Sequence, residues 1–265
     1  MSLEAQVAAQ LPYLRRYARA LSGSQADGDR CVAATLEAAL ADPALRQSLR
    51  GGRVPLYRAF TMVWSASLRD SADVGSSPFS DHELAAQERL RAVTPLNRQA
   101  LLLTTLEDFS VEEAALVLDV DPAAIVRLVA DAVAEIDRES TTSVLIIEDE
   151  PLISMQLEDL VGSLGHTICG TAATRGQASQ VIAERTPGLI LADIQLADGS
   201  SGLDAVDDIL ARQDLPVIFI TAYPERLLTG DRPEPTYLVT KPFQESTVRA
   251  AISQALFFGS GRPVG

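Results

Sequence analysis

The spacing of apolar residues along the chain changes once, near residue 140. Before that point apolar side chains recur every three or four positions, a spacing that places them on one face of a helix. The clearest examples are Leu36, Ala39 and Leu40, and then Ile125, Leu128, Val129, Ala132, Val133 and Ile136. We therefore predict a series of amphipathic helices up to about residue 138, with almost no strand.

Helix boundaries are visible within this first part. In three places a capping residue stands before a proline that can open a helix, namely Asp42-Pro43, Thr94-Pro95 and Asp121-Pro122. The stretch 71–80 is rich in small residues and interrupts the helical pattern. It predicts two helical subdomains, residues 1–72 and 80–138.

After a polar connector at 138–142, short apolar runs alternate with helical segments. The runs are 144–147, 167–170, 189–192, 216–220 and 237–239, and the helical segments are 151–163, 175–185, 203–212, 224–229 and 244–257. Continuous apolar strands that alternate with helices are typical of a parallel sheet covered on both faces. We predict an all-α domain followed by a doubly wound α/β domain of five parallel strands, residues 143–260.

The charge of the chain narrows its possible partners. With 47% hydrophobic and 22% charged residues the composition is that of a globular protein. The net charge is −14, and both parts contribute, with −6 in residues 1–140 and −8 in residues 141–265. Binding to a phosphate backbone depends on surplus Lys and Arg, so this balance argues against a nucleic-acid-binding protein.

The sequence also carries indications of location. The first residues lack a secretory signal, and no stretch approaches the ~20 apolar residues that cross a bilayer. Cys31 and Cys169 are the only cysteines and have no metal-ligand spacing. We expect buried thiols in a reducing cytoplasm, and no membrane contact.

Polar residues follow the predicted strands where chemistry gathers in a parallel sheet, at the carboxyl ends. Glu148 and Asp149 follow the first strand, Asp193 the third, Thr221 the fourth and Lys241 the fifth. Carboxylates that converge in this way repel one another and need a cation, and hard oxygen ligands suit Mg²⁺. The sequence thus predicts a magnesium site at this edge of the sheet.

Two neighbouring residues refine this prediction. Glu150 stands at the start of a predicted helix, where an acid is favoured by the helix dipole, and we do not assign it to the site. Lys241 is the only lysine among 22 cationic residues. A compact ammonium at this position is suited to pair with a phosphoryl oxygen.

Four segments together resemble the signatures of response-regulator receiver domains, namely residues 144–150, 191–204, 218–222 and 240–243. They occur in the order of that family and cover about residues 143–258. The resemblance implies that Asp193 accepts a phosphoryl group from a phosphohistidine on a sensor histidine kinase. It also implies that the protein is not an enzyme beyond this transfer and a slow loss of the phosphoryl group.

The resemblance further implies how the site binds its metal. Asp149, Asp193 and the backbone carbonyl of Gln195 would hold Mg²⁺, while Glu148 would act mostly through water. A phosphatase of the haloacid-dehalogenase type would need a second aspartate at position 195, and its absence argues against that activity.

The switch residues follow the same pattern with one departure. Thr221 and Lys241 would bind the new phosphoryl group and transmit the signal by moving. Receivers usually carry an aromatic residue three positions before the lysine, where this chain has Leu238, with Tyr237 one position earlier and Thr240 as the extra residue. The aromatic relay is therefore not assigned.

The first part of the chain resembles bacterial sigma factors. Segments 89–103 and 106–127 are similar to region 4, where a helix-turn-helix reads promoter DNA, and residues 5–70 are similar to region 2. The charge of the recognition helix is wrong for that task. Residues 105–139 contain two arginines and ten acidic residues, so duplex DNA should repel this surface.

A sigma-like shape without affinity for DNA suits an anti-sigma factor as partner. Fusion to a receiver resembles the PhyR-type anti-anti-sigma regulators of the general stress response. The resemblance implies that phosphorylation of Asp193 loosens an interface between the two domains, and that the freed surface captures a small NepR-type anti-sigma factor. The alternative is a phosphorylation-controlled transcription factor that binds promoter DNA through residues 95–138.

Four further residues are given structural interpretations. Phe60 and Trp64 could lie at an interface between the domains, but the core is the favoured place for each. His82 and His166 have no acidic or nucleophilic neighbours in sequence and are interpreted as structural or solvated.

Overall fold

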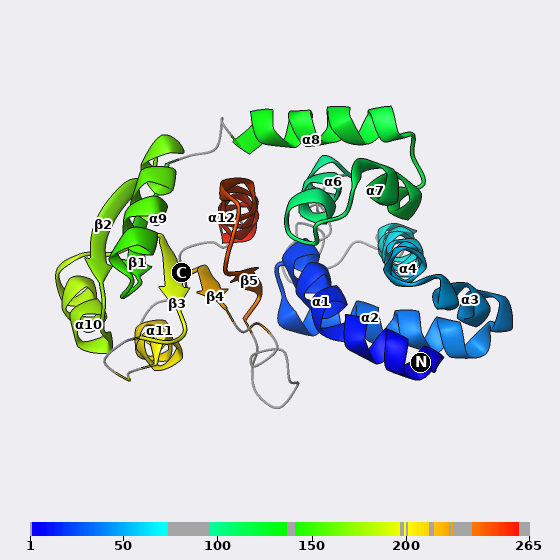
Figure 1. The fold of residues 1–265 in the computed structure, drawn as a ribbon, viewed down its shortest axis with the longest axis horizontal. Coiled ribbons are helices and arrows are strands. Elements are labelled where there is room, and N and C mark those ends of the chain that lie inside the picture. Colours follow the sequence, from blue (N-terminus) through cyan, green and yellow to red (C-terminus); the bar gives the residue numbers. More distant parts are fainter. Residues whose placement is uncertain are drawn as a thin grey trace. The chain divides into compact units, whose positions relative to one another are not determined.

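The computed structural model of the chain describes residues 2–73, 96–136, 141–196, 199, 201–211, 215–222, 224 and 235–259, with the backbone alone for 68–73 (Figure 1). It divides into two compact units, Met1–Ala132 and Val133–Gly265. Segments 80–95 and 137–138, His82 and the predicted helix 224–229 beyond its first residue lie outside the described residues.

Capped helices form the first half of the first unit. They are α1 (Leu3–Ser22), α2 (Gln25–Ala41), α3 (Pro43–Ser48), the 3-10 turn η1 (Leu49–Gly51) and α4 (Arg53–Asp73). The side chains of Ser2, Ser24 and Asp42 accept backbone N–H groups at the starts of α1, α2 and α3. The predicted helix start at Asp42-Pro43 is thereby confirmed.

The second half contains α6 (Leu96–Thr105), α7 (Val111–Leu118) and α8 (Pro122–Ile136). Ser110 and Glu113 form a reciprocal capping box at the start of α7. Asp119 ends α7 in the left-handed region, with φ 58° and its N–H bonded to the carbonyl of Ala115. Helices α7 and α8 thus form the helix-turn-helix that the sequence predicts.

An aromatic cluster lies in the core of this unit and joins its two halves. Tyr17 of α1 contacts Tyr57 and Phe60 of α4, with ring centroids 5.4 and 5.9 Å apart. Tyr57 in turn contacts Phe109, which precedes α7, at 4.9 Å. Phe60 stacks on Trp64 at 6.1 Å, and both are buried, which confirms the core interpretation of these two residues.

One burial prediction for this unit was wrong, and one residue of the apolar pattern is exposed. Leu40 continues the apolar spacing of α2, yet its side chain is 74% exposed at the end of that helix. Cys31 is half-buried rather than buried, whereas Cys169 in the second unit is buried as expected. Helical spacing alone therefore does not determine how deeply a residue of α2 is buried.

The second unit is built on a five-stranded, entirely parallel sheet. Its strands are β1 (Ser143–Ile147), β2 (Thr167–Ala172), β3 (Leu189–Asp193), β4 (Val217–Thr221) and β5 (Tyr237–Thr240), in the order β2-β1-β3-β4-β5. Four helices are described, α9 (Pro151–Ser163), α10 (Arg175–Glu184), α11 (Gly202–Leu210) and α12 (Glu245–Gly259). The predicted doubly wound α/β fold is confirmed.

The helices pack on opposite faces of this sheet. In Figure 1, α9 and α12 lie on one side and α10 and α11 on the other. Leu238 belongs to the core cluster that includes Ala178 of α10 and Val206 of α11. The adjacent Tyr237 is also buried, and its hydroxyl donates to the carbonyl of Gln254 in α12 at 3.4 Å. The aromatic side chain therefore faces the α12 side of the sheet, and the leucine faces the other side.

The register brings the functional candidates to one edge of the sheet. Ile147 pairs with Ala192, so Glu148 follows β1 beside Asp193. Asp193 pairs with Ile220, and Thr221 pairs with Thr240 just before Lys241. None of the helices in the described ranges is both long and apolar enough to cross a membrane.

Candidate functional site

Three carboxylates converge at the carboxyl edge of the sheet. Glu148, Asp149 and Asp193 each place a carboxylate oxygen within 4.8 Å of the other two. Glu148 and Asp193 are buried, and Asp149 is partly exposed. Such a cluster of hard oxygen donors, open to solvent on one side, fits a hydrated divalent cation. The structure thus brings together the three carboxylates that the sequence suggested as metal ligands.

Lys241 lies against the same carboxylates. Its Nζ is 2.6 Å from Asp193 Oδ2, 2.8 Å from Glu148 Oε2 and 3.7 Å from Glu150 Oε1. Glu150 does precede a helix, as the sequence predicts, but its carboxylate also reaches this ammonium. With Asp149, four carboxylates surround one cation, so the pocket has an excess of negative charge.

The electrostatics of the pocket follow from burial and this charge excess. Burial raises the pKa of Glu148, and the hydrogen bond and charge of Lys241 offset only part of that rise. Burial alone would lower the pKa of Lys241, but hydrogen bonds to Asp193 and Glu148 outweigh it, so the pKa is raised. The lysine is therefore held firmly in its charged form.

Backbone groups hold Asp193 and Lys241 in place. Asp193 Oδ1 accepts the N–H groups of Ile194 at 2.5 Å and Gln195 at 3.2 Å. Oδ2 is the oxygen that contacts Lys241. The backbone N–H of Lys241 donates to the carbonyl of Thr221 at 2.7 Å, which ties the ends of β4 and β5 together. One oxygen of Asp193 is thus fixed by the backbone, while the other has a partner that can move.

Thr221 and Gln195 are the remaining residues that the sequence predicts for the site. Thr221 is buried at the end of β4, on the same edge as Asp193. Gln195 is exposed and pairs with Ser201 across the loop. Its N–H contacts Asp193, whereas metal binding by its carbonyl stays a prediction.

Gly202 is a residue of the site that sequence reasoning did not assign. It opens α11, and its N–H donates to the carbonyl of Ile194 at 2.9 Å. A Cβ at this position would lie 1.7 Å from the carbonyl oxygen of Asp193, closer than any two such atoms can approach. Only glycine therefore allows α11 to pack on the backbone of Asp193. The sequence around Gly202 indicates a turn but does not indicate this contact.

A second charged cluster lies in the core of the first unit. Arg16 of α1 donates to Glu107 Oε1 at 2.9 Å and to the carbonyl of Leu106 at 2.8 Å. Tyr57 of α4 donates to the other oxygen of Glu107 at 2.7 Å. Burial lowers the pKa of Arg16, but Glu107 outweighs this effect and the pKa is raised. Both oxygens of the buried carboxylate thus have partners, and its charge is balanced.

Arginines of α4 extend this connection to α7. Arg53 stacks on the ring of Phe109 at 4.0 Å and donates to the carbonyl of Glu107 and to Glu113. Arg58 pairs with Asp119 at 2.7 Å. These contacts bind the second half of the unit to the first, which explains why both halves belong to one compact body.

The described part of the helix-turn-helix is acidic. Residues 105–136 contain eight acidic residues and only one arginine, Arg127. On α8, Arg127 is accompanied by Asp131 and Glu135, and both Arg127 and Asp131 are exposed. As the sequence predicts, acidic residues therefore occupy the surface on which a DNA-binding helix-turn-helix would carry basic residues.

An acidic pocket with a lysine at the edge of a five-stranded parallel sheet, joined to a helix-turn-helix unit, defines the class of protein as a response regulator with a sigma-factor-like domain. Three family models agree. Residues 7–61 match the sigma2 domain of PhyR, residues 90–139 the sigma-like domain of the response regulator PhyR, and residues 144–253 the response-regulator receiver domain.

Relatives extend the match over nearly the whole chain. The phyllosphere-induced regulator PhyR of Methylorubrum extorquens is 53% identical over 97% of this chain and 96% of its own. A PhyR stress response regulator of known structure is 54% identical over 99% of this chain and 100% of its own, with a TM-score of 0.81. The chain belongs to the PhyR family of response regulators.

Bartonella quintana provides a further relative, an anti-anti-sigma factor PhyR. Its structure has a TM-score of 0.82 and 46% identity, covering 98% of this chain and 97% of that one. A co-crystal structure contains the PhyR of this organism in complex with the anti-sigma factor NepR (46% identity, 97% of this chain and 100% of that one, TM-score 0.40).

Proposed function

We propose that this protein is a phosphorylation-dependent anti-anti-sigma factor in which Asp193 is the phosphoacceptor. The observation that carries the proposal is the combination of two surfaces in one chain. One is a pocket with surplus carboxylates around Asp193 and Lys241. The other is a helix-turn-helix with the wrong charge for DNA. We also propose that the two domains comprise residues 1–138 and 143–260. The first domain would contain the subdomains 1–72 and 80–138.

The residues of the pocket support phosphoryl transfer from a sensor histidine kinase. An oxygen of Asp193 would attack phosphorus, forming a P–O bond while the P–N bond of the phosphohistidine breaks and its electron pair returns to the imidazole. Backbone N–H groups already orient Oδ1 of Asp193. Oδ2 is bonded to the flexible side chain of Lys241, so this oxygen would be able to exchange that partner for another.

The carboxylates would hold Mg²⁺ at this edge. Asp149, Asp193 and the carbonyl of Gln195 would bind it directly, with Glu148 acting mostly through water. The ion, when bound, supplies positive charge that offsets the repulsion between the carboxylates and the incoming phosphoryl oxygens. The fit rests on the three carboxylate oxygens that lie within 4.8 Å of one another.

Lys241 and Thr221 would convert phosphorylation into a conformational change. On the phosphorylated protein, Lys241 would leave Oδ2 of Asp193 and pair with a phosphoryl oxygen, and the Thr221 hydroxyl would bind another. Because the backbone of Lys241 is bonded to Thr221, a shift in one moves the end of the other strand. Such a shift would bias the chain toward a state in which the receiver releases the sigma-like domain.

The released sigma-like domain would capture a NepR-type anti-sigma factor and so free a stress sigma factor. Membership of the PhyR family supports this partner, and the relative from Bartonella quintana has been crystallised with NepR. A helix-turn-helix also favours a second candidate, promoter binding. The surplus of acidic residues in 105–136 weighs against it, because the DNA backbone would be repelled.

Phosphorylation of the full-length protein tests the proposal directly. Acetyl phosphate with Mg²⁺ should label the wild type, and Asp193→Asn should not be labelled at all. NepR should bind the labelled protein more tightly than the unlabelled one. Binding to a promoter fragment that strengthens on phosphorylation would replace the anti-sigma function with the transcription-factor alternative.

A second variant separates acceptance of the phosphoryl group from signalling. Lys241→Ala removes the ammonium but none of the carboxylates. It should still be labelled, yet NepR should bind the labelled and unlabelled variant with similar affinity. Normal switching by this variant would remove Lys241 from the mechanism.

A further inference from the structure

Glu150 is the exposed member of the group of carboxylates around Lys241. Its side chain is 62% exposed, whereas the side chain of Glu148 is fully buried and that of Lys241 is 10% exposed. Oε1 of Glu150 lies 3.7 Å from Nζ of Lys241. The backbone N–H of Glu150 donates to Oε1 of Glu148 at 3.2 Å, which holds the backbone at this point. A carboxylate thus lies at the solvent side of the pocket, within reach of its ammonium.

Local structure does not explain this position of the Glu150 side chain. Glu150 is the N-cap residue of α9, yet its side chain makes no capping hydrogen bond. Pro151 opens the helix and has no N–H that such a cap could satisfy. The Glu150 carboxylate is also not one of the three that converge within 4.8 Å of one another. Its printed distance to Lys241 therefore marks the contact through which it can affect the pocket.

The contacts of Lys241 differ in how easily they can be exchanged. Its ammonium has two short contacts, at 2.6 Å to Asp193 and 2.8 Å to Glu148, and the longer one to Glu150. A phosphoryl group that reaches Asp193 brings further negative charge into this pocket and needs the same ammonium. Glu150 repels that group and competes with it for Lys241. Both effects act over distances shorter than the Debye length of about 10 Å at 0.1 M salt.

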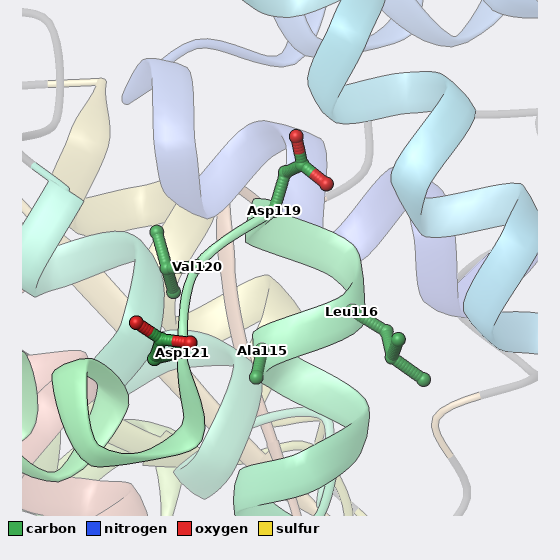
Figure 2. Close-up of a pocket in the computed structure, with 5 residues that line it drawn as sticks. All are labelled: Ala115, Leu116, Asp119, Val120 and Asp121. Carbon is green, nitrogen blue, oxygen red and sulfur yellow. The ribbon is translucent and has the colours of Figure 1, made fainter.

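Proximity to a reactive group distinguishes Glu150 from exposed acids elsewhere. Figure 2 shows a hollow at the turn between α7 and α8, with the carboxylates of Asp119 and Asp121 at the two ends of the turn. Asp119 pairs with Arg58 on the surface at 2.7 Å, and such solvated pairs contribute little. The contact of Glu150, in contrast, is with the ammonium that is proposed to bind the phosphoryl group.

We propose that Glu150 slows the phosphorylation of Asp193, because it holds Lys241 and repels the anionic phosphodonor. The proposal rests on the proposed role of Asp193 as phosphoacceptor and adds a residue that controls how readily this role is carried out. Glu150 acts through Lys241 and through its charge, so it is a positioning residue and does not itself react. It favours the unphosphorylated state, since each donor must displace a carboxylate from the ammonium.

The rate of labelling of the full-length protein by acetyl phosphate with Mg²⁺ tests this role. Glu150→Gln keeps the size of the side chain and removes its charge. At low ionic strength it should be labelled about 2- to 5-fold faster than the wild type, as expected for an exposed charge near the reacting groups. At about 1 M salt, where the Debye length is about 3 Å, the two rates should become nearly equal.

Two further measurements separate the effect of charge from a structural effect. Phosphoramidate carries less negative charge than acetyl phosphate, so Glu150→Gln should accelerate labelling by phosphoramidate less. Glu150→Asp keeps the charge and should have a rate closer to that of the wild type than to that of Glu150→Gln. Added Mg²⁺ should raise the thermal stability of Glu150→Gln as it does that of the wild type. Loss of that stabilisation would make Glu150 a metal ligand and overturn its proposed role.

Glu184 provides a matched control. It is exposed at the end of α10, which leads to the amino end of β3 and thus to the edge of the sheet opposite the pocket. Glu184→Gln makes the same change in charge and should be labelled at the wild-type rate. If the wild type is labelled and Glu150→Gln is labelled equally fast or more slowly at low salt, the role of Glu150 is refuted and Asp193 remains the phosphoacceptor. If the wild type is not labelled at all, the proposed function fails, and the role of Glu150 fails with it.

Discussion

Each unit of the molecule contains a cation paired with carboxylate, buried Arg16 in the first unit and largely buried Lys241 in the second, and the two clusters differ in their charge balance. In the first unit, Arg16 and Glu107 form one pair, and Tyr57 donates to the second carboxylate oxygen. In the second unit, Lys241 faces Asp193 and Glu148 at 2.6 and 2.8 Å, with further carboxylates beside them. The first cluster is neutral and closed, whereas the second is anionic and open.

This difference distinguishes a cluster suited to a structural role from one suited to binding a cation. A neutral, fully bonded pair in a core gains nothing from an added ion, and loss of one partner leaves an unpaired buried charge. A pocket with surplus negative charge is under electrostatic repulsion that an added cation relieves. The two clusters should therefore respond in opposite ways to removal of one carboxylate.

The largest effect is expected from the closed cluster. Glu107→Gln leaves the buried guanidinium of Arg16 without a counter-charge and should lower the free energy of unfolding of the first unit by about 3–5 kcal/mol. Urea unfolding measures this, with the transition of each unit followed separately because two units need not unfold together. Phosphorylation by acetyl phosphate should be unaffected.

An exposed ion pair of the same unit is the control for this prediction. Arg30 pairs with Asp27 on the surface of α2, and its side chain is 74% exposed. Arg30→Gln should change the free energy of unfolding by less than about 0.5 kcal/mol, as for other solvated pairs. A loss as small as this in Glu107→Gln would show that the buried cluster adds no structural stability.

The open cluster should show the opposite response. Asp149→Asn removes one of the repelling carboxylates, so the thermal stability of the second unit should stay equal or rise. Labelling by acetyl phosphate with Mg²⁺ should nevertheless be lost, because one of the proposed metal ligands is gone. Added Mg²⁺ should stabilise the wild type and not the variant. A destabilised variant with normal labelling would contradict the distinction between the two clusters.

Much of the second unit follows from local sequence. Continuous apolar runs give strands whose bounds differ from β1–β5 by only one or two residues at an end, and the polar residues that end them converge because parallel strands share one carboxyl edge. The departure at Leu238 also has a physical basis. Alternate residues face opposite sides of a strand, so Tyr237 and Leu238 contact different helices.

Other features depend on contacts between distant segments. Arg16 and Glu107 are 91 residues apart, and neither sequence neighbourhood indicates that they pair. The contact between the carboxylate of Glu150 and the ammonium of Lys241 depends on the path of the chain between β1 and α9. Leu40 is exposed although it continues the apolar spacing of α2. Helical period and capping signals are local, whereas these features are fixed by tertiary packing.

An intermediate effect is expected from Gly202, which packs on the backbone of the proposed phosphoacceptor Asp193. Gly202→Ala places a methyl group in the space of the Asp193 carbonyl, so the loop that carries Asp193 must move. The rate of labelling by acetyl phosphate should fall at least about 10-fold, since misplacement of a reacting group by about 1 Å is costly.

Gly162 in α9 provides the matched control for this change. A Cβ there meets nothing within 4 Å, and alanine is the better helix former. Gly162→Ala should label at the wild-type rate. Equal rates for the two variants would mean that the close approach of α11 does not position Asp193.

The smallest effect is expected at Asp29, a partly exposed carboxylate in the first unit. Burial raises its pKa, but hydrogen bonds from Arg19 and Arg15 outweigh this and lower the pKa. Its contribution to stability is therefore complete above the unfolded pKa of about 4 and is lost as pH falls through the lower folded value.

Between pH 5 and pH 2, the wild type should thus lose more stability than Asp29→Asn, by less than about 1 kcal/mol because solvent screens the carboxylate. The difference between the two unfolding curves isolates this residue from the other acids, and high salt should shrink it further. An identical pH dependence would mean that Arg15 and Arg19 do not lower the pKa of Asp29 in the folded state below its value in the unfolded chain. A partly solvated pair would then resemble the surface pair of Arg30 rather than the buried pair of Arg16.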